Sequence, residues 1–221
     1  MLLGDGWLQS RNGVFGMQHS VKQEDYLLWK ADLINNVFID KKLPKRCTLT
    51  KHRNKVKGIY YDSIRATFQW KKYLKPFLYP KAYRNEKKYI QYLLEQIYNP
   101  IHLAIWFMDD GGERTKVLRN GDFCPPHYRL FIYDFTEGQV NFSKEWFKYK
   151  YKIEPKILLH KKEKPYFSFS VDESKEIFKI CYPYFKELDS MKNKFKGSFQ
   201  RFNLEIEDTP EKGENIVQAN S

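Results

Sequence analysis

Cysteine is scarce in this sequence: the 221 residues contain three, Cys47, Cys124 and Cys181. They form no CxxC pair and no disulfide framework, so we predict reduced thiols and no cysteine zinc site. The five histidines never pair at metal-ligand spacing, and we expect most of them on the surface. Long apolar runs are also missing, and the apolar opening is too short for a signal peptide, so no membrane segment is predicted. We expect a reducing compartment, either the cytoplasm with its nucleoid or an organelle matrix.

Acidic residues are outnumbered, with 27 Asp and Glu against 39 Lys and Arg, which gives a formal charge of +12. The shortage is greater in the body of the chain, because residues 205–221 carry −4 and leave +16 on residues 1–204. A folded body this basic favours a polyanionic partner, and nucleic acid is the commonest one. Composition alone leaves a merely soluble, lysine-rich surface as the alternative. The acidic tail has no periodicity and is predicted to be disordered.

The chain contains an internal repeat. Four landmarks recur in one order at nearly one offset, whereas chance similarity would scatter the offsets. The pairs are Asp5 and Asp110 at 105 residues, Lys88 and Lys194 at 106, Pro76 and Pro183 at 107, and the basic clusters 51–57 and 160–164 at about 108. We therefore predict two tandem copies of one fold, residues 1–98 and 99–204, followed by the tail at 205–221.

The first copy predicts the order hairpin, helix, hairpin, helix. Asn12-Gly13 is a strong hairpin turn between strands at 7–11 and 14–21. Apolar residues at helical spacing follow over 22–37. A second hairpin is predicted from strands at 46–52 and 59–68, with the basic cluster at its tip, and then a helix over 69–79.

The second copy repeats this order, so the fold class is mixed α/β. Strands are predicted near 114–119 and 127–134, and later over 156–159 and 166–171. Thr136 and Gln139 form a capping box for the helix between the two hairpins. Ser170 or Asp172 caps the last helix, which runs through Tyr184.

The segment 102–112 predicts a short apolar helix that ends in Asp109 and Asp110 and stops at a glycine in a left-handed cap. Carboxylates there lie at the unfavourable end of the helix dipole, which suggests a bound cation. For one copy alone, a solvated Asp-Gly-Gly turn is the alternative. The second copy of the motif, which ends at Asp5, favours the bound cation over the solvated turn. Two such helices can pack through small residues and bring Asp5 and Asp110 together.

Two carboxylates that converge on one point repel each other unless metal ions or a shared proton intervene. Mg²⁺ prefers oxygen ligands, and carboxylates together with a substrate phosphate complete its shell. Such a site can activate water and stabilise the leaving oxygen in phosphodiester hydrolysis. The sequence therefore predicts a site for Mg²⁺ or another divalent cation.

The segment Leu103–Gly111 closely resembles the LAGLIDADG motif of intron-encoded homing endonucleases, and residues 1–6 look like the last two-thirds of a partner motif. The resemblance extends to about residue 200. It implies two pseudo-symmetric αββαββα halves, whose curved antiparallel sheets form a saddle over double-stranded DNA, in a single monomeric chain. It also implies that the two motif helices form the interface between the halves.

By the same resemblance, Asp5 and Asp110 are the metal-binding acids, each cutting one strand to leave short 3′ overhangs, with Gly4 and Asp109 beside them in the metal site. The family often has a catalytic lysine late in each half. Lys88 and Lys194 match it here, although Lys87 and Lys192 compete for the register.

DNA recognition would belong to the hairpins, because a two-stranded ribbon fits the major groove. Most of the polar residues on such ribbons touch only phosphate. The candidates are Arg11, Gln18, Lys51, Arg53, Lys55 and Lys57 in the first half, and Arg114, Lys116, Arg119, His160, Lys161, Lys162 and Lys164 in the second. Core packing is expected instead for the tryptophans at helical apolar positions, which are Trp29, Trp70, Trp106 and Trp146.

Two other functions share this fold. An intron RNA-splicing maturase would keep the basic surface and bind intron RNA, and the sequence does not exclude it. A non-catalytic DNA-binding regulator would keep the sheets and lose the acids, but both acids are present. Only three residues precede Gly4, so the first motif helix is expected to be truncated. A version extended at its N-terminus is expected to melt at a higher temperature and to restore cutting by the Asp5 centre.

Overall fold

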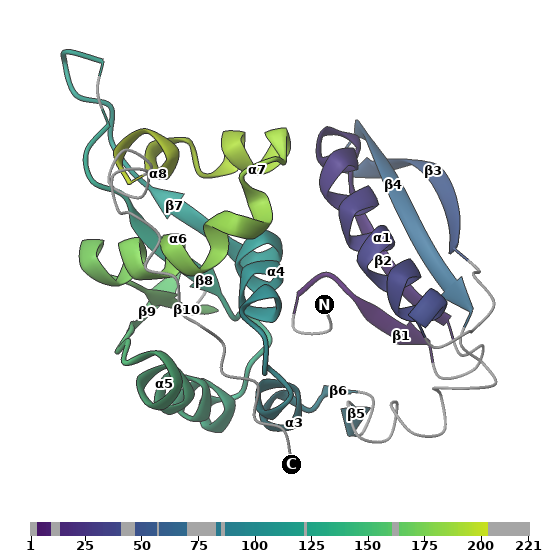
Figure 1. Ribbon diagram of the computed structural model, residues 1–221, viewed down its shortest axis with the longest axis horizontal. Helices are drawn as coiled ribbons and strands as arrows, with labels where there is room; N and C mark the ends of the chain where they lie inside the picture. Colours follow the sequence, from purple (N-terminus) through teal and green to yellow (C-terminus); the bar gives the residue numbers. More distant parts are fainter. Residues whose placement is uncertain are drawn as a thin grey trace, which may run out of the picture.

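The computed structural model describes residues 4–9, 14–40, 47–56, 58–69, 83–84, 87–121, 123–160 and 164–202. These residues contain two four-stranded antiparallel sheets with helices packed on them (Figure 1). The strand orders are β1-β2-β4-β3 and β7-β8-β10-β9, so each sheet is built from two hairpins in the same arrangement. The predicted mixed α/β fold with two related antiparallel sheets is confirmed.

The first sheet follows the predicted order of hairpin, helix and hairpin. Its elements are β1 (Trp7–Gln9), β2 (Val14–Ser20), a 3-10 turn η1 (Val21–Gln23), α1 (Glu24–Asp40), β3 (Cys47–Val56) and β4 (Ile59–Gln69). β1 and β2 are antiparallel with Gln9 opposite Val14, whereas a two-residue turn at Asn12-Gly13 would place Arg11 opposite Val14. The predicted turn itself lies outside the described residues. β3 is longer than predicted, so the basic cluster lies along the strand and not only at its tip. The helix predicted over 69–79 falls mostly outside the described residues, as does the acidic tail.

A short strand pair and a helix lead into the second half: β5 (Tyr83–Arg84), β6 (Lys87–Lys88) and α3 (Ile90–Glu95). The elements that follow are α4 (Pro100–Asp110), β7 (Gly111–Arg114), β8 (His127–Phe131), α5 (Glu137–Tyr151), β9 (Lys156–His160), β10 (Lys164–Ser168), α6 (Val171–Phe185), α7 (Asp189–Lys194) and α8 (Lys196–Arg201). The capping box predicted for Thr136 and Gln139 is present. Of the two alternatives for the later cap, Ser170 is the N-cap, in a capping box with Glu173, and Asp172 lies in the first turn of α6. β7 begins earlier than predicted, directly at the end of α4.

Helix α4 is buried on all sides, as expected of a helix that is apolar all round. Asn99 caps it by accepting the Ile101 N–H at 2.9 Å, and every residue from Leu103 to Met108 is buried. Trp106 stacks against Phe147, with ring centroids 5.8 Å apart. The core role predicted for Trp106 is confirmed, and Trp29 and Trp146 are partly buried against the same core. Trp70 lies outside the described residues.

Helix α1 joins the first half to the second (Figure 1). Its Leu27, Ala31 and Ile34 belong to the smaller core of the first sheet. Its Tyr26, by contrast, is fully buried in the larger core around α4. Asp25 also accepts the Ser190 N–H of α7 at 3.0 Å. The two sheets are therefore held together through α1, α4 and α7.

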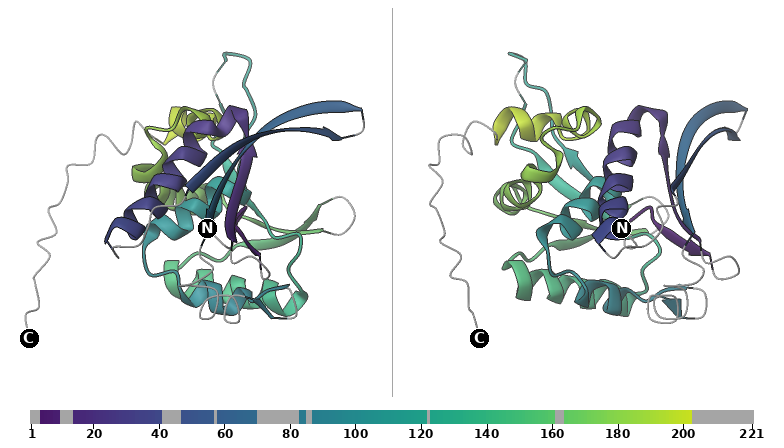
Figure 2. Two further views of the ribbon diagram at one scale, coloured as in Figure 1. Left: turned by 90° about the vertical axis from the view of Figure 1, so that its right-hand side faces the viewer. Right: turned by 45° about the vertical axis from the view of Figure 1, so that its right-hand side comes forward.

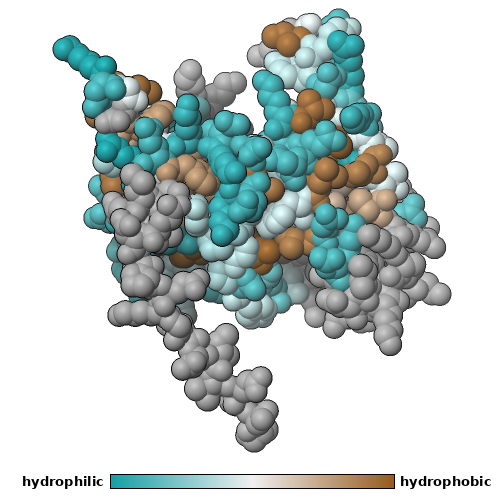
Figure 3. All heavy atoms as spheres, turned by 45° about the horizontal axis from the view of Figure 1, so that its top comes forward, coloured by the Kyte–Doolittle hydropathy of each residue, from teal (hydrophilic) through white to brown (hydrophobic). Residues whose placement is uncertain are grey.

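The hairpins β3–β4 and β9–β10 extend to the same side of the molecule, and β3–β4 is long and curved (left view of Figure 2). The face drawn in Figure 3 is mostly hydrophilic, with hydrophobic residues in separate patches. This is the surface expected when most apolar side chains are in two cores. Among the described residues, no helix is both long enough and apolar enough to span a membrane.

The predicted left-handed cap of α4 is wrong. Gly111 has φ −84° and ψ 167°, an extended conformation in which the chain passes straight into β7. Glycine is required there for close approach, because a Cβ at this position would lie 2.4 Å from the Phe107 carbonyl oxygen and 2.8 Å from the Phe107 ring.

Gly111→Ala is expected to lower the free energy of unfolding by about 1–3 kcal/mol, the usual cost of overpacking. The melting temperature should fall by roughly 2–4 °C for each kcal/mol in a chain of this size. Gly112→Ala is the matched control, because a Cβ there meets nothing within 4 Å. Equal melting temperatures for the two variants would show that the close contact at Gly111 carries no cost.

Candidate active site

The ends of the two motifs meet at one place. The Asp5 N–H donates to Asp109 Oδ2 at 3.0 Å, across 104 residues of chain. Ligand atoms of Asp5, His19 and Asp109 all lie within 4.8 Å of one another. Asp5, Asp109 and Asp110 each act electrostatically on both Tyr26 and Lys194. The fold therefore gathers three acids from the two halves beside the C-terminal end of α4.

Asp109 is one of these acids, and its side chain is fully buried. Its Oδ1 accepts hydrogen bonds from Lys30 Nζ and from the Tyr26 hydroxyl, both at 2.7 Å. Burial acts to raise the pKa of Asp109, but the Lys30 ammonium and these hydrogen bonds outweigh it and hold that pKa below its ordinary value. Asp109 is therefore ionised at neutral pH and paired with a fully buried lysine.

The predicted metal ligands fit a divalent cation unequally. Asp5 has a carboxylate that is 42% exposed, and Asp110 is half-buried where α4 ends. Oxygen donors of this kind are those that Mg²⁺ prefers. Both oxygens of Asp109 accept hydrogen bonds from protein groups, and the ammonium 2.7 Å away opposes a second cation. Gly4 has no side chain, and the Asp109 carboxylate fills the space that a side chain on Gly4 would need. Of the predicted ligands, Asp5 and Asp110 therefore have the carboxylates that suit a divalent cation.

His19 is a site residue that the sequence reasoning missed, because we expected most histidines on the surface. It is 5% exposed, and its ring nitrogens lie 3.5 Å from Asp5 Oδ2 and 3.8 Å from Asp109 Oδ1. Burial, followed by the Lys30 charge, lowers the pKa of His19 to about 4 against the pull of Asp109, so the ring is neutral at pH 7. The alternation Phe15, Met17, His19 along β2 was the available signal, since it places His19 on the buried face.

Lys194 lies at the end of α7, against the last turn of α4. Its ammonium donates to the carbonyl oxygens of Met108 at 2.6 Å and Asp109 at 3.1 Å. Burial lowers the pKa of Lys194, and the three acids oppose that shift. Lys192 instead pairs with the exposed Asp189, so Lys194 is the lysine of this segment that faces the acids. The side chain of Lys88 lies outside the described part of the chain, and its role stays a prediction.

In the first sheet, Gln18 is part of a polar network on the face opposite the core. Its Oε1 accepts from Arg65 Nε at 3.1 Å and Nη2 at 2.7 Å, and its Nε2 donates to Ser63 at 2.8 Å. Asn54 donates to the same Ser63 hydroxyl at 2.9 Å. Arg65 and Asn54 were not among the predicted DNA-binding residues.

The predicted basic residues of β3 lie on the other face of the ribbon, because side chains alternate along a strand. Lys51, Arg53 and Lys55 are opposite Ile64, Asp62 and Tyr60 in the register, whereas Gln18 is opposite Arg65. The guanidinium of Arg53 is 3.8 Å from Asp62 and lies over the Tyr60 ring. These residues can reach DNA only from the face of the ribbon that also carries Ile64, which is the face opposite Gln18. Arg11 and Lys57 lie outside the described residues.

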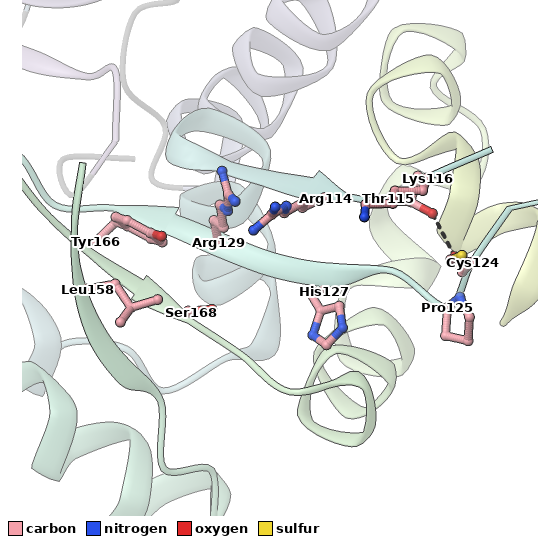
Figure 4. Close-up of a pocket in the computed structure, with 10 residues that line it drawn as sticks. All are labelled: Arg114, Thr115, Lys116, Cys124, Pro125, His127, Arg129, Leu158, Tyr166 and Ser168. Atoms are coloured by element: carbon pink, nitrogen blue, oxygen red, sulfur yellow. Dashed lines mark hydrogen bonds between the residues drawn. The ribbon is translucent and has the colours of Figure 1, made fainter. Parts of the chain in front are cut away.

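The second sheet has a shallow basic hollow on the face away from its core (Figure 4). Of the predicted residues, Arg114 and Lys116 line it, and His127 and Arg129 add two that were not predicted. Of the other predicted residues, Arg119 is exposed on the loop after β7, and His160 and Lys164 form a cross-strand pair at the end of β9–β10. Lys161 and Lys162 lie outside the described residues.

Two related antiparallel sheets with acids at their junction define a protein of the LAGLIDADG type. The family model described as the LAGLIDADG DNA endonuclease family matches residues 1–177, and the chain belongs to this family. The solved structure of "the homing endonuclease I-WcaI bound to its DNA recognition sequence" aligns with a TM-score of 0.61 and 24% identity, covering 87% of this chain and 81% of that one. That likeness shows the fold.

Among curated relatives, the cytochrome b mRNA maturase bI2 of Debaryomyces hansenii is 30% identical over 165 residues, which are 72% of this chain and 56% of the maturase. The protein RecA of Mycolicibacterium chitae is 34% identical over 129 residues, 53% of this chain and 26% of RecA. The chain thus spans about half the length of the first relative and about a quarter of the second.

Proposed function

We propose that this chain is a site-specific endonuclease that cuts both strands of a long double-stranded DNA site with the help of a divalent cation, Mg²⁺ in the first instance. The observation that carries the proposal is the meeting of Asp5 with the Asp110 end of α4, between two sheets that each present a polar or basic face. Both halves are in one chain, so the active unit is a monomer.

Asp5 and Asp110 would hold the cation at the junction of the halves. A bound divalent cation would supply activation of water and stabilisation of the leaving oxygen. Lys194 fixes the last turn of α4 through two carbonyl oxygens and offsets the negative end of the helix dipole beside Asp110. The Lys30–Asp109 pair adds no net charge, so the charge of the site comes mainly from Asp5, Asp110 and Lys194.

The two sheets would each bind one half of the DNA site. Gln18, held by Arg65 and Ser63, presents an oriented amide, the group that reads adenine in the major groove. Arg114, His127 and Arg129 present cationic or imidazole groups suited to guanine and phosphate. I-WcaI, which has this fold, is bound to its DNA recognition sequence in its structure.

The test is cleavage of a plasmid library of randomised DNA sites by the purified chain, with Mg²⁺ and with EDTA. We expect no product in EDTA, and with Mg²⁺ we expect products cut at one shared sequence: linear ones with short 3′ overhangs where both centres cut, and nicked circles where only the Asp110 centre cuts. The proposal would be contradicted if the chain cut DNA as fast in EDTA as in Mg²⁺, or if the cleaved sites shared no common sequence.

A second candidate function, an intron RNA-splicing maturase, is favoured by the similarity to the maturase bI2. It would use the same basic faces to bind intron RNA and would not need the acids. An in-vitro splicing assay with wild-type chain and with Asp110→Asn separates the two, because a maturase activity should survive this substitution. Either function would place the chain beside nucleic acid, in a nucleoid or an organelle matrix.

A further inference from the structure

We infer that Asp109 is a positioning residue: with Lys30 and Tyr26 it forms a clamp between the two halves that fixes the backbone of Asp5. The inference rests on the proposed function only for the importance of Asp5. It gives Asp109 a role different from the metal ligand that the motif resemblance suggested.

The clamp consists of one carboxylate and three donors. Asp109 belongs to the motif helix of the second half, whereas Lys30, Tyr26 and Asp5 all belong to the first half. One carboxylate oxygen accepts from Lys30 and Tyr26, each at 2.7 Å, and the other accepts from the Asp5 N–H at 3.0 Å. The acid that ends one motif therefore holds the main chain of the other motif in place.

Steric fit restricts the clamp to one arrangement. A Cβ on Gly4 would lie 2.2 Å from Asp109 Oδ2 and 2.4 Å from Asp109 Cβ. Gly4 and Asp109 occupy matching positions in the repeat, each one residue before the acid of its motif. An aspartate at both positions would collide and place two buried negative charges together. The Gly4 and Asp109 pair thus favours packing of the first motif against the second. Packing of the second motif against another copy of itself would place two aspartates together.

The charges explain why neither partner of the pair can be lost alone. Asp109 and Lys30 both have 0% exposed side chains, so removal of one leaves the other as an unpaired buried ion. Replacement of both by neutral groups of similar shape removes that penalty. An asparagine at 109 could still accept the Asp5 N–H with its oxygen and donate to Tyr26 with its amide. An alanine could do neither.

These differences define a matched set of variants, studied without metal and without DNA. Asp109→Asn alone should lower the melting temperature by about 10 °C, because Lys30 becomes unpaired. Asp109→Asn with Lys30→Met should recover most of that loss. Asp109→Ala with Lys30→Met has the same charge but offers the Asp5 N–H no acceptor. Hydrogen exchange of the Asp5 amide, followed by NMR, should be about 10-fold or more faster in this alanine variant than in the asparagine one.

Equal exchange of the Asp5 amide in the two double variants would overturn the positioning role, and a failure of Lys30→Met to rescue Asp109→Asn would overturn the clamp. If the alanine variant does not fold, Gly4→Ala in the wild-type background is the second probe. It should also speed exchange at Asp5, because its Cβ displaces the carboxylate, and unchanged exchange would count against the inference. These readouts do not involve cleavage, so a chain that shows them and cuts no DNA would refute the proposed function and leave the clamp intact.

Discussion

Replacement of Asp110 by asparagine is expected to abolish double-strand cleavage and leave DNA binding intact. The amide keeps the shape of the side chain but removes the charge that would hold the cation, and a bound metal contributes several kcal/mol to such a reaction. The rate of cutting at the Asp110 centre should therefore fall by about 10³-fold or more. Binding can become tighter, because a negative charge near the phosphates is removed. A plasmid assay and a gel-shift assay measure the two effects separately.

The form of the plasmid product identifies the centre that was lost. If each acid serves one strand and both centres cut, Asp110→Asn should give nicked circles, Asp5→Asn should nick the opposite strand, and the double variant should leave supercoiled DNA. Asp172→Asn is the matched control, because Asp172 is an exposed acid in the first turn of α6, away from the acids at the end of α4. Linear product formed by Asp110→Asn at the wild-type rate would refute the assignment of the site.

The parts of the fold that could be predicted depend on short stretches of sequence. Thr136 with Gln139 and Ser170 with Glu173 are each a complete capping signal within four residues, and both are present in the structure. The antiparallel pair β1–β2 was predicted from the Asn12-Gly13 turn signal, but its register, with Gln9 opposite Val14, differs by two residues from the one that a two-residue turn there would give. The repeat added the long-range information, because nearly equal offsets indicated that the two sheets are built alike.

The parts that could not be predicted depend on distant partners. Lys30 and Asp109 are 79 residues apart, and no local rule requires a lysine in the middle of α1 to be buried. The end of α4 at Gly111 was predicted with the wrong backbone conformation, because a glycine satisfies a left-handed cap and a close approach equally well. The face on which Lys51, Arg53 and Lys55 lie was open to prediction from the period of two, but only once the register with β4 was known.

Binding to DNA is expected to depend steeply on salt. The charge of +16 on residues 1–204 implies that several lysines and arginines neutralise phosphates, and each such contact releases counterions. Affinity should fall by roughly 10³-fold or more between 50 and 200 mM salt, with a slope of about −0.9 per neutralised phosphate in the logarithmic plot. Fluorescence anisotropy with a labelled duplex at several salt concentrations measures this slope. A flat response would indicate a protein or small-molecule partner.

The same plot tests whether the face shown in Figure 4 contacts the DNA. Arg114 and Lys116 line the hollow on the face of the second sheet away from the core, whereas α5 packs on the core face through Phe147. Arg114→Gln with Lys116→Gln should therefore reduce the magnitude of the slope by about two, one contact for each residue. Lys148→Gln with Lys150→Gln, on α5, removes the same charge from the opposite side of the sheet and should leave the slope unchanged. Because both variants lower the net charge equally, an equal change in slope would show that only the overall charge, and not this face, governs binding.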